Sequence, residues 1–182
     1  PHLFHMIQGG RYQRQAGSHF NPYIYDDIKT IADHLHYAGN QWNQADISGS
    51  AQLGGGHAHA GLMIYQGDSW PAEYRGKVLM NNIHGACLNM DVLERRGSGF
   101  VGHHAPNPVN FNDKWSQIVN IEEGPDGAVY VNDWYDKNQC HSNDANQHDR
   151  SNGRIFKISY GPSKQPSIDL RKKTDDELIQ LA

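Results

Sequence analysis

The sequence is short of charge and of cysteine, and it has no long hydrophobic run. Charged residues make up 20% of the 182 residues and hydrophobic residues 37%, and both shares are below the averages for globular domains. No segment is long and apolar enough to be a membrane-spanning helix. The formal net charge of −4 gives no electrostatic reason to expect a nucleic acid or an anionic membrane as a partner.

Several motifs that define enzyme classes are also missing. There is no G-x-S-x-G elbow, P-loop, dinucleotide fingerprint or EF-hand loop, which argues against serine hydrolysis and nucleotide binding. The two cysteines, Cys87 and Cys140, form no C-x-x-C pair, and Lys137 stands where a haem-attachment motif ending at His141 needs a cysteine. We interpret them as two unrelated thiols, because a disulfide cannot be inferred from sequence alone.

Histidine and glycine are abundant, and they coincide in one stretch. The run Gly54–Gly61 reads GGGHAHAG and precedes the apolar residues Leu62–Tyr65. In an extended strand His57 and His59 would point to the same face, and the glycines permit close backbone approach. We predict that these histidines form a general-base or metal-binding pair at the entry of an inner strand. The alternative is that they bond to the backbone at a sheet edge.

Short strands separated by turn residues are predicted from about residue 60 to residue 160. The clearest turn is Gly124–Gly127 (GPDG), where Pro presets φ and Gly accepts a positive φ. The predicted strands are Ala60–Tyr65, Lys77–Ile83, Leu88–Glu94, Ser98–His104, Ser116–Glu122, Ala128–Asp133 and Gly153–Tyr160. This spacing indicates an all-β sandwich, barrel or propeller.

The predicted strands group as four and then three. Residues 60–104 would form one complete propeller blade, and residues 116–160 a blade that lacks one strand. Since such a blade leaves an edge that must be paired or covered, we expect the sequence to be a piece of a longer or nicked protein. The predicted divisions are a partial propeller over residues 1–160 (blades at about 56–110 and 111–160), a linker over 161–173 and the start of a helical region over 174–182.

Helices are predicted near both ends of the chain. Asn21-Pro22 is typical of a helix start. Apolar residues follow at helical spacing, at positions Ile28, Ile31, Ala32 and Leu35. At the other end Thr174–Glu177 (TDDE) is a capping-box pattern. The sequence therefore predicts a short N-terminal helix and a helical region that begins at residue 174.

Further polar residues are candidates for a site. Asn82 and His84 lie at the end of a predicted strand, where they would bind sugar hydroxyls or a cofactor carboxylate, or else cap turns. Asp133 and Trp134 close the strand after the GPDG turn, where an aromatic beside carboxylates suits carbohydrate stacking or Ca²⁺ ligation; otherwise the aspartate caps a turn. Arg14 could bind an anionic group bidentately, although a solvated arginine is commoner.

Six blocks of the sequence resemble a known family. They are Pro1–Gly17 (PHLFHMIQGGRYQRQAG), Gly54–Tyr65 (GGGHAHAGLMIY), Trp70–Gly85 (WPAEYRGKVLMNNIHG), Met90–Gly99 (MDVLERRGSG), Gly124–Lys137 (GPDGAVYVNDWYDK) and Asp149–Tyr160 (DRSNGRIFKISY). They resemble the propeller domain of planctomycete-type membrane-bound dehydrogenases, which is similar in turn to soluble quinoprotein glucose and sorbosone dehydrogenases. The P-x-E-Y-R-G and G-P-D-G-x-x-Y blocks are shared most widely.

The resemblance implies the C-terminal part of a six-bladed β-propeller. It implies pyrroloquinoline quinone and Ca²⁺ as cofactors, and a location in the periplasm or outside the cell. The partners that it implies are the remaining blades and a C-terminal helical and haem domain, or another chain. The family's catalytic and cofactor-binding residues lie largely in earlier blades, so they do not map individually onto this sequence.

These observations lead to three hypotheses for function. The first is oxidation of a sugar or alcohol hydroxyl, with His57 or His59 as base and electrons passed to a quinone or haem partner. The cofactor-binding candidates are then Arg14, Asn82, His84, Asp133 and Trp134, and the metal-ligand candidates are His57, His59 and Asp133. The second hypothesis is a non-catalytic propeller that binds glycan or protein partners. The third is a metal-dependent lyase or hydrolase that uses the histidines.

Overall fold

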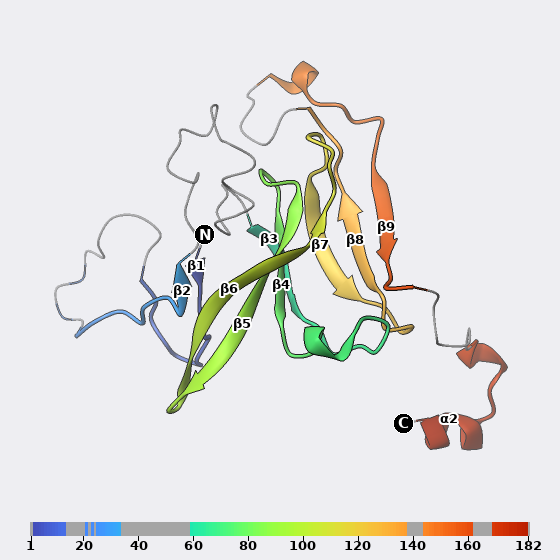
Figure 1. Ribbon diagram of the computed structural model, residues 1–182, viewed down its shortest axis with the longest axis horizontal. Helices are drawn as coiled ribbons and strands as arrows, with labels where there is room; N and C mark the ends of the chain where they lie inside the picture. Colours follow the sequence, from blue (N-terminus) through green and yellow to red (C-terminus); the bar gives the residue numbers. More distant parts are fainter. Residues whose placement is uncertain are drawn as a thin grey trace.

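The computed structural model describes residues 2–13, 21, 23, 25–33, 59–137, 144–161 and 169–181. Within them the chain forms two larger antiparallel sheets that pack against each other, with a two-stranded ribbon beside the first sheet (Figure 1). The predicted all-β character is confirmed, and so is the grouping of the strands as four and then three.

The first sheet is a four-stranded meander in sequence order. Its strands are β3 (His59–Ile64), β4 (Val78–Asn82), β5 (Cys87–Arg96) and β6 (Gly99–Asn110). All five residues of β4 are buried, because the second sheet covers one of its faces and the N-terminal segment covers the other. A strand that is covered on both faces carries a continuous apolar run rather than an alternating one, which explains Val78-Leu79-Met80.

The second sheet is a three-stranded meander. Its strands are β7 (Ile118–Glu123), β8 (Val129–Asp133) and β9 (Arg154–Ile158). The GPDG turn connects β7 to β8, and Gly127 has the positive φ of 71° that the turn requires. Beside this turn the Asp126 carboxylate accepts hydrogen bonds from Ala128 N and the Tyr130 hydroxyl and pairs with Lys157. The shared G-P-D-G-x-x-Y block therefore builds a hairpin in this chain.

One apolar core joins the two sheets. Its buried members are Tyr65, Trp70, Leu79, Leu88, Ile118, Ile121, Val129 and Val131. The first strands of the sheets, β3 and β7, lie side by side: a Cβ on Gly61 would stand 3.0 Å from Ile121 N, and Gln66 N donates to Glu123 Oε2. Because positions 61 and 66 lie beside 121 and 123 in the same order, the two strands run in the same direction.

Hydrogen bonds also cross between the sheets at the end of β3. The Tyr65 hydroxyl, fully buried, accepts from Trp70 N and donates to Gly127 O, both at 2.8 Å. Trp70 Nε1 donates to Ile158 O at 3.0 Å. Burial raises the pKa of the Tyr65 phenol, so this hydroxyl keeps its proton and its role as a donor. Arg75, from the shared P-x-E-Y-R-G block, donates from Nε to Gly67 O at the same joint.

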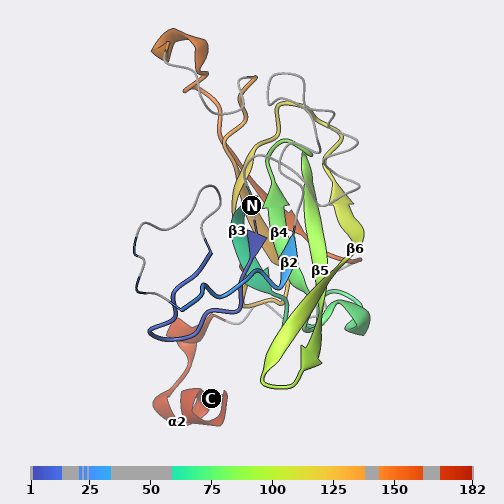
Figure 2. The ribbon, with the colours of Figure 1, turned by 90° about the vertical axis from the view of Figure 1, so that its left-hand side faces the viewer.

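The N-terminal segment covers the other face of the first sheet, as Figure 2 shows. Strands β1 (His2–Leu3) and β2 (Ala32–Asp33) form an antiparallel ribbon, and Ile31 O accepts from Gly102 N of β6. Leu3 packs with Val78 and Met80 in a second apolar cluster.

The predicted N-terminal helix is wrong over the described residues 25–33. Ile28 forms a parallel bridge with Tyr12, and Ala32 lies in β2. Ile31 and Ala32 pack beside the buried residues of the first sheet in extended backbone. This tertiary contact outweighs the helical spacing of the apolar residues.

The predicted helix start at residue 174 is confirmed. Helix α2 spans Asp175–Leu181. The Thr174 hydroxyl accepts from Glu177 N, and Glu177 Oε2 accepts from Thr174 N at 2.9 Å, which is a capping box. Over the residues that the structure describes, no helix has both the length and the apolar character needed to cross a membrane.

Candidate functional site

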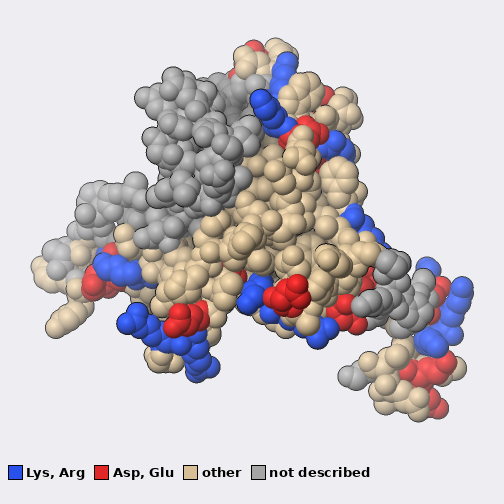
Figure 3. Space-filling model, viewed as in Figure 1, with Lys and Arg blue, Asp and Glu red and all other residues tan. Residues whose placement is uncertain are grey.

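The predicted site residues that the structure describes lie at strand ends and in connections at one end of the sheets. The β4–β5 turn and the described parts of the β8–β9 connection, residues 134–137 and 144–153, both lie at the upper end in Figure 1. On the face shown in Figure 3, Lys, Arg, Asp and Glu side chains gather at the margins, and the middle of this face carries almost none.

A row of hydrogen-bonded amides crosses the first sheet near this end. Asn82 Nδ2 donates to Asn89 Oδ1 at 2.9 Å, and Asn89 Nδ2 donates to Asn107 Oδ1 at 2.8 Å. His59 lies directly opposite Asn82 in the β3–β4 register, and opposed residues share a face of a sheet. The structure therefore brings the predicted residues His59 and Asn82 together, whereas His57 lies outside the described residues.

His84 lies in the turn between β4 and β5. This side chain is 0% exposed, and the turn is held by Gly85 N, which donates to Asn82 Oδ1 at 2.8 Å. Ala86 completes the turn with a φ of 47°. Cys87, which follows, is a free, buried thiol whose pKa burial raises to about 12. His84 and Asn82 are thus enclosed in the protein, and Cys140 lies outside the described residues.

Asp133 joins three segments of the second sheet. Its Oδ1 accepts from Gln117 N at 2.7 Å and Tyr135 N at 2.9 Å. Its Oδ2 accepts from the Ser116 hydroxyl at 3.1 Å and from Arg154, whose Nη2 lies at 2.6 Å. Burial lowers the pKa of the Arg154 guanidinium, but its hydrogen bonds and ion pairs with Asp133 and Asp113 together outweigh this effect, so the pKa is raised. Asp133 is buried, with 3% of the residue exposed.

Asp133 was predicted to be a ligand of Ca²⁺, and its contacts do not suit that role. Both carboxylate oxygens accept hydrogen bonds. The positively charged guanidinium of Arg154 already lies beside Oδ2, where a bound cation would have to be. Among the described residues, no group of three or more His, Cys, Asp and Glu side chains is placed to hold a metal ion. Asp133 is therefore a structural carboxylate that holds backbone and side-chain donors together and balances the charge of Arg154.

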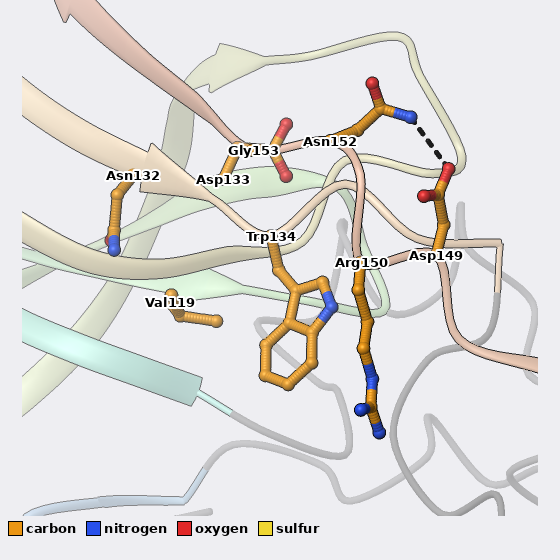
Figure 4. A pocket seen from close by; sticks show the side chains of 8 residues that line it. All are labelled: Val119, Asn132, Asp133, Trp134, Asp149, Arg150, Asn152 and Gly153. Carbon is orange, nitrogen blue, oxygen red and sulfur yellow. Dashed lines mark hydrogen bonds between the residues drawn. The ribbon is translucent and has the colours of Figure 1, made fainter. Parts of the chain in front are cut away.

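A shallow hollow of about 330 Å³ lies where β8 ends and β9 begins (Figure 4). It is lined by Val119, Asn132, Asp133, Trp134, Asp149, Arg150, Asn152 and Gly153. Val119 is the extra residue of a bulge in the pairing of β7 with β8, and bulges re-aim side chains. Successive side chains of a strand alternate between faces, and accordingly the Asp133 carboxylate points away from Asn132 and Trp134 in Figure 4.

Trp134 is the aromatic residue among those that line the hollow. The residue is 53% exposed, and its backbone is anchored by Trp134 N donating to Gln117 O at 3.0 Å. The indole and the Arg150 side chain extend toward the same side of the hollow (Figure 4). The aromatic plane is therefore held on a fixed strand end while its face stays accessible.

The loop before β9 is shaped by its own side chains. Asp149 Oδ1 accepts from Ser151 N at 2.9 Å and from the Ser151 hydroxyl at 2.6 Å, and Oδ2 accepts from Asn152 Nδ2 at 2.7 Å. These hydrogen bonds, that of the Ser151 hydroxyl foremost, lower the pKa of Asp149. At the base of the loop Asp149 N donates to Asp136 Oδ2 at 3.0 Å. The loop thus presents an ionised carboxylate and an amide in a preformed arrangement.

Of the predicted site residues, only Asp133 and Trp134 line this hollow. His59, Asn82 and His84 belong to the first sheet, and Arg14 lies outside the described residues. The other lining residues were not predicted as site residues: Val119, Asn132, Asp149, Arg150, Asn152 and Gly153. The sequence of Asp149–Gly153 (DRSNG) could have indicated this loop, since Asp, Ser, Asn and Gly are typical turn residues.

The fold and the hollow define a protein of two packed antiparallel sheets, with aromatic and polar side chains lining a hollow at one end of the second sheet. The chain belongs to the family described as domain of unknown function DUF7133, which matches residues 2–161. The match spans the N-terminal ribbon and both sheets. Neither the curated proteins nor the solved structures contain a match to the chain.

Proposed function

We propose that the chain forms two adjacent blades of a six-bladed β-propeller whose rim binds a carbohydrate. Propeller blades are four-stranded sheets arranged around a central channel. Strands β3–β6 have this topology, and β7–β9 correspond to its first three strands. The parallel neighbours β3 and β7 would be the inner strands beside the channel. The number of blades comes from the resemblance to quinoprotein dehydrogenases.

The observation that carries the ligand assignment is the exposed Trp134 indole above a rim of polar groups. A pyranose ring offers C–H groups on its faces and hydroxyls around its edge. Trp supplies a large, rigid apolar surface, while Asn132, Asp149 and Asn152 supply amide and carboxylate groups suited to hydroxyls. An apolar platform with a few placed polar groups is the usual composition of a small-molecule site.

We expect Trp134→Ala to weaken saccharide binding at least tenfold. Removal of a central aromatic anchor commonly lowers affinity by about 2 kcal/mol or more. The measurement is isothermal titration of the full-length protein with cellotetraose and with tetragalacturonate, a neutral and an acidic tetrasaccharide. Two probes are used so that binding can be detected whether the natural ligand is neutral or acidic.

Trp115→Ala is the matched control for this substitution. Trp115 is 48% exposed and packs against Tyr135 with ring centroids 5.8 Å apart, and it does not line the hollow. Its replacement should leave saccharide affinity within twofold of the unmodified protein. The proposal is wrong if the unmodified protein binds neither tetrasaccharide, or if the Trp134 and Trp115 variants bind alike.

For the complete protein we propose oxidation of a bound sugar or alcohol, with electrons passed to a quinone or haem partner. The support is the sequence resemblance, which also suggests a periplasmic or extracellular location. We expect full-length protein supplied with pyrroloquinoline quinone and Ca²⁺ to reduce an acceptor dye when a sugar or alcohol is added. Absence of quinone-dependent dye reduction across a panel of sugars and alcohols would contradict this activity without affecting the binding proposal.

A further inference from the structure

Arg150, in the loop before β9, and Arg154, within β9, differ in the partners that they have among the described residues. Arg154 is paired with Asp133 and Asp113 and stacks on Tyr135, with its guanidinium carbon 3.6 Å from the ring centroid. Arg150 has no ion-pair or hydrogen-bond partner within the part of the chain that the structure describes. It is an exposed residue at the margin of the hollow.

The geometry places this cation beside the aromatic platform. Trp134 follows β8 and Arg150 precedes β9, yet both side chains project to the same side of the hollow (Figure 4). The Asp149 carboxylate is turned toward Asn152 instead, where it accepts the 2.7 Å hydrogen bond. A ligand that lies on the indole would therefore meet the guanidinium at one edge.

We propose that the hollow takes an acidic saccharide, with a uronate ring on Trp134 and its carboxylate bound by Arg150. This inference rests on the proposed carbohydrate binding and adds the class of ligand. A guanidinium presents planar, paired donors that match a carboxylate bidentately, whereas a neutral sugar would leave its charge unused. Because the whole chain has a net charge of −4, long-range attraction would not concentrate a polyanion here, and binding must come from the local cation.

The test compares tetragalacturonate with its fully methyl-esterified form, a neutral ligand of the same ring geometry. At an ionic strength of about 0.15 M, where long-range charge effects are screened, the full-length protein should bind the acid at least tenfold more tightly than the ester. Arg150→Gln should reduce this difference to within about twofold, mainly by weakening the binding of the acid. The control is Arg96→Gln, which makes the same change of charge at an exposed residue of β5, outside the hollow; it should preserve the preference.

The outcomes separate this inference from the proposed function. If acid and ester bind equally, or if Arg150→Gln keeps the preference, the acidic-ligand inference is wrong while carbohydrate binding stands. If neither form binds, and cellotetraose also fails to bind, both proposals are wrong. A loss of preference in both the Arg150 and the Arg96 variants would indicate a general charge effect and would also overturn the assignment to Arg150.

Discussion

Asp133→Asn is expected to lower the free energy of unfolding by about 2–3 kcal/mol, because buried groups that donate to a charged partner lose their acceptor. The substitution keeps the size of the side chain but removes the charge that faces Arg154 at 2.6 Å. It also places an NH₂ group against donors, since both carboxylate oxygens accept hydrogen bonds. Tyr135, with a φ of 56°, loses part of the contact that holds its backbone in this uncommon conformation.

Asp113→Asn provides the matched control, because Asp113 contacts the same guanidinium at 3.3 Å but is 34% exposed at its side chain. Exposed ion pairs contribute about 1 kcal/mol or less. Urea unfolding of the two variants and the unmodified protein, followed by circular dichroism, measures both changes. Equal effects of the two substitutions would show that Asp133 is not the centre of this junction.

Leu79→Ala is expected to lower the free energy of unfolding by about 2–5 kcal/mol, the range for a fully buried leucine whose removal leaves a cavity. Leu79 is 0% exposed and lies in the core between the sheets. The side chain contributes to the only large apolar contact that the described residues show between the first and second sheets. Its loss should therefore destabilise both sheets together.

Leu62→Ala tests the same change at a site on the neighbouring strand that is 53% exposed. Since about half of this side chain is already in water, its removal should cost about 1 kcal/mol. Urea unfolding monitored by tryptophan fluorescence and by circular dichroism should give one shared transition for each variant. Separate transitions in the Leu79 variant would mean that the sheets fold independently, and the account of one joined core would fail.

The strand regions could be predicted because alternation and turn chemistry are local signals. The GPDG turn and the pattern around β9 are examples, and both are confirmed. The end of β6 could not be predicted: the strand continues to Asn110, past the expected end at His104. Pro106 and Pro108 argue against a central strand, but β6 lies at the edge of its sheet, where a missing N–H is tolerated.

The site residues whose roles could not be predicted depend on contacts between segments that are far apart in the sequence. Trp134 could be predicted because an aromatic that follows a strand is visible in the sequence. The role of Asp133 could not, since Arg154 is 21 residues further along and the pairing depends on the β8–β9 register. Arg150 has no local feature that distinguishes it from a solvated arginine; only the fold brings it beside Trp134.

The most direct test of the central proposal is a crystal structure of the full-length protein with bound tetragalacturonate. The account predicts a pyranose ring on the face of the Trp134 indole, with a uronate carboxylate at the Arg150 guanidinium and the neighbouring rings extending along the open rim. A structure in which another blade or segment of the protein fills the hollow and covers Trp134, or in which the saccharide binds elsewhere, would contradict it.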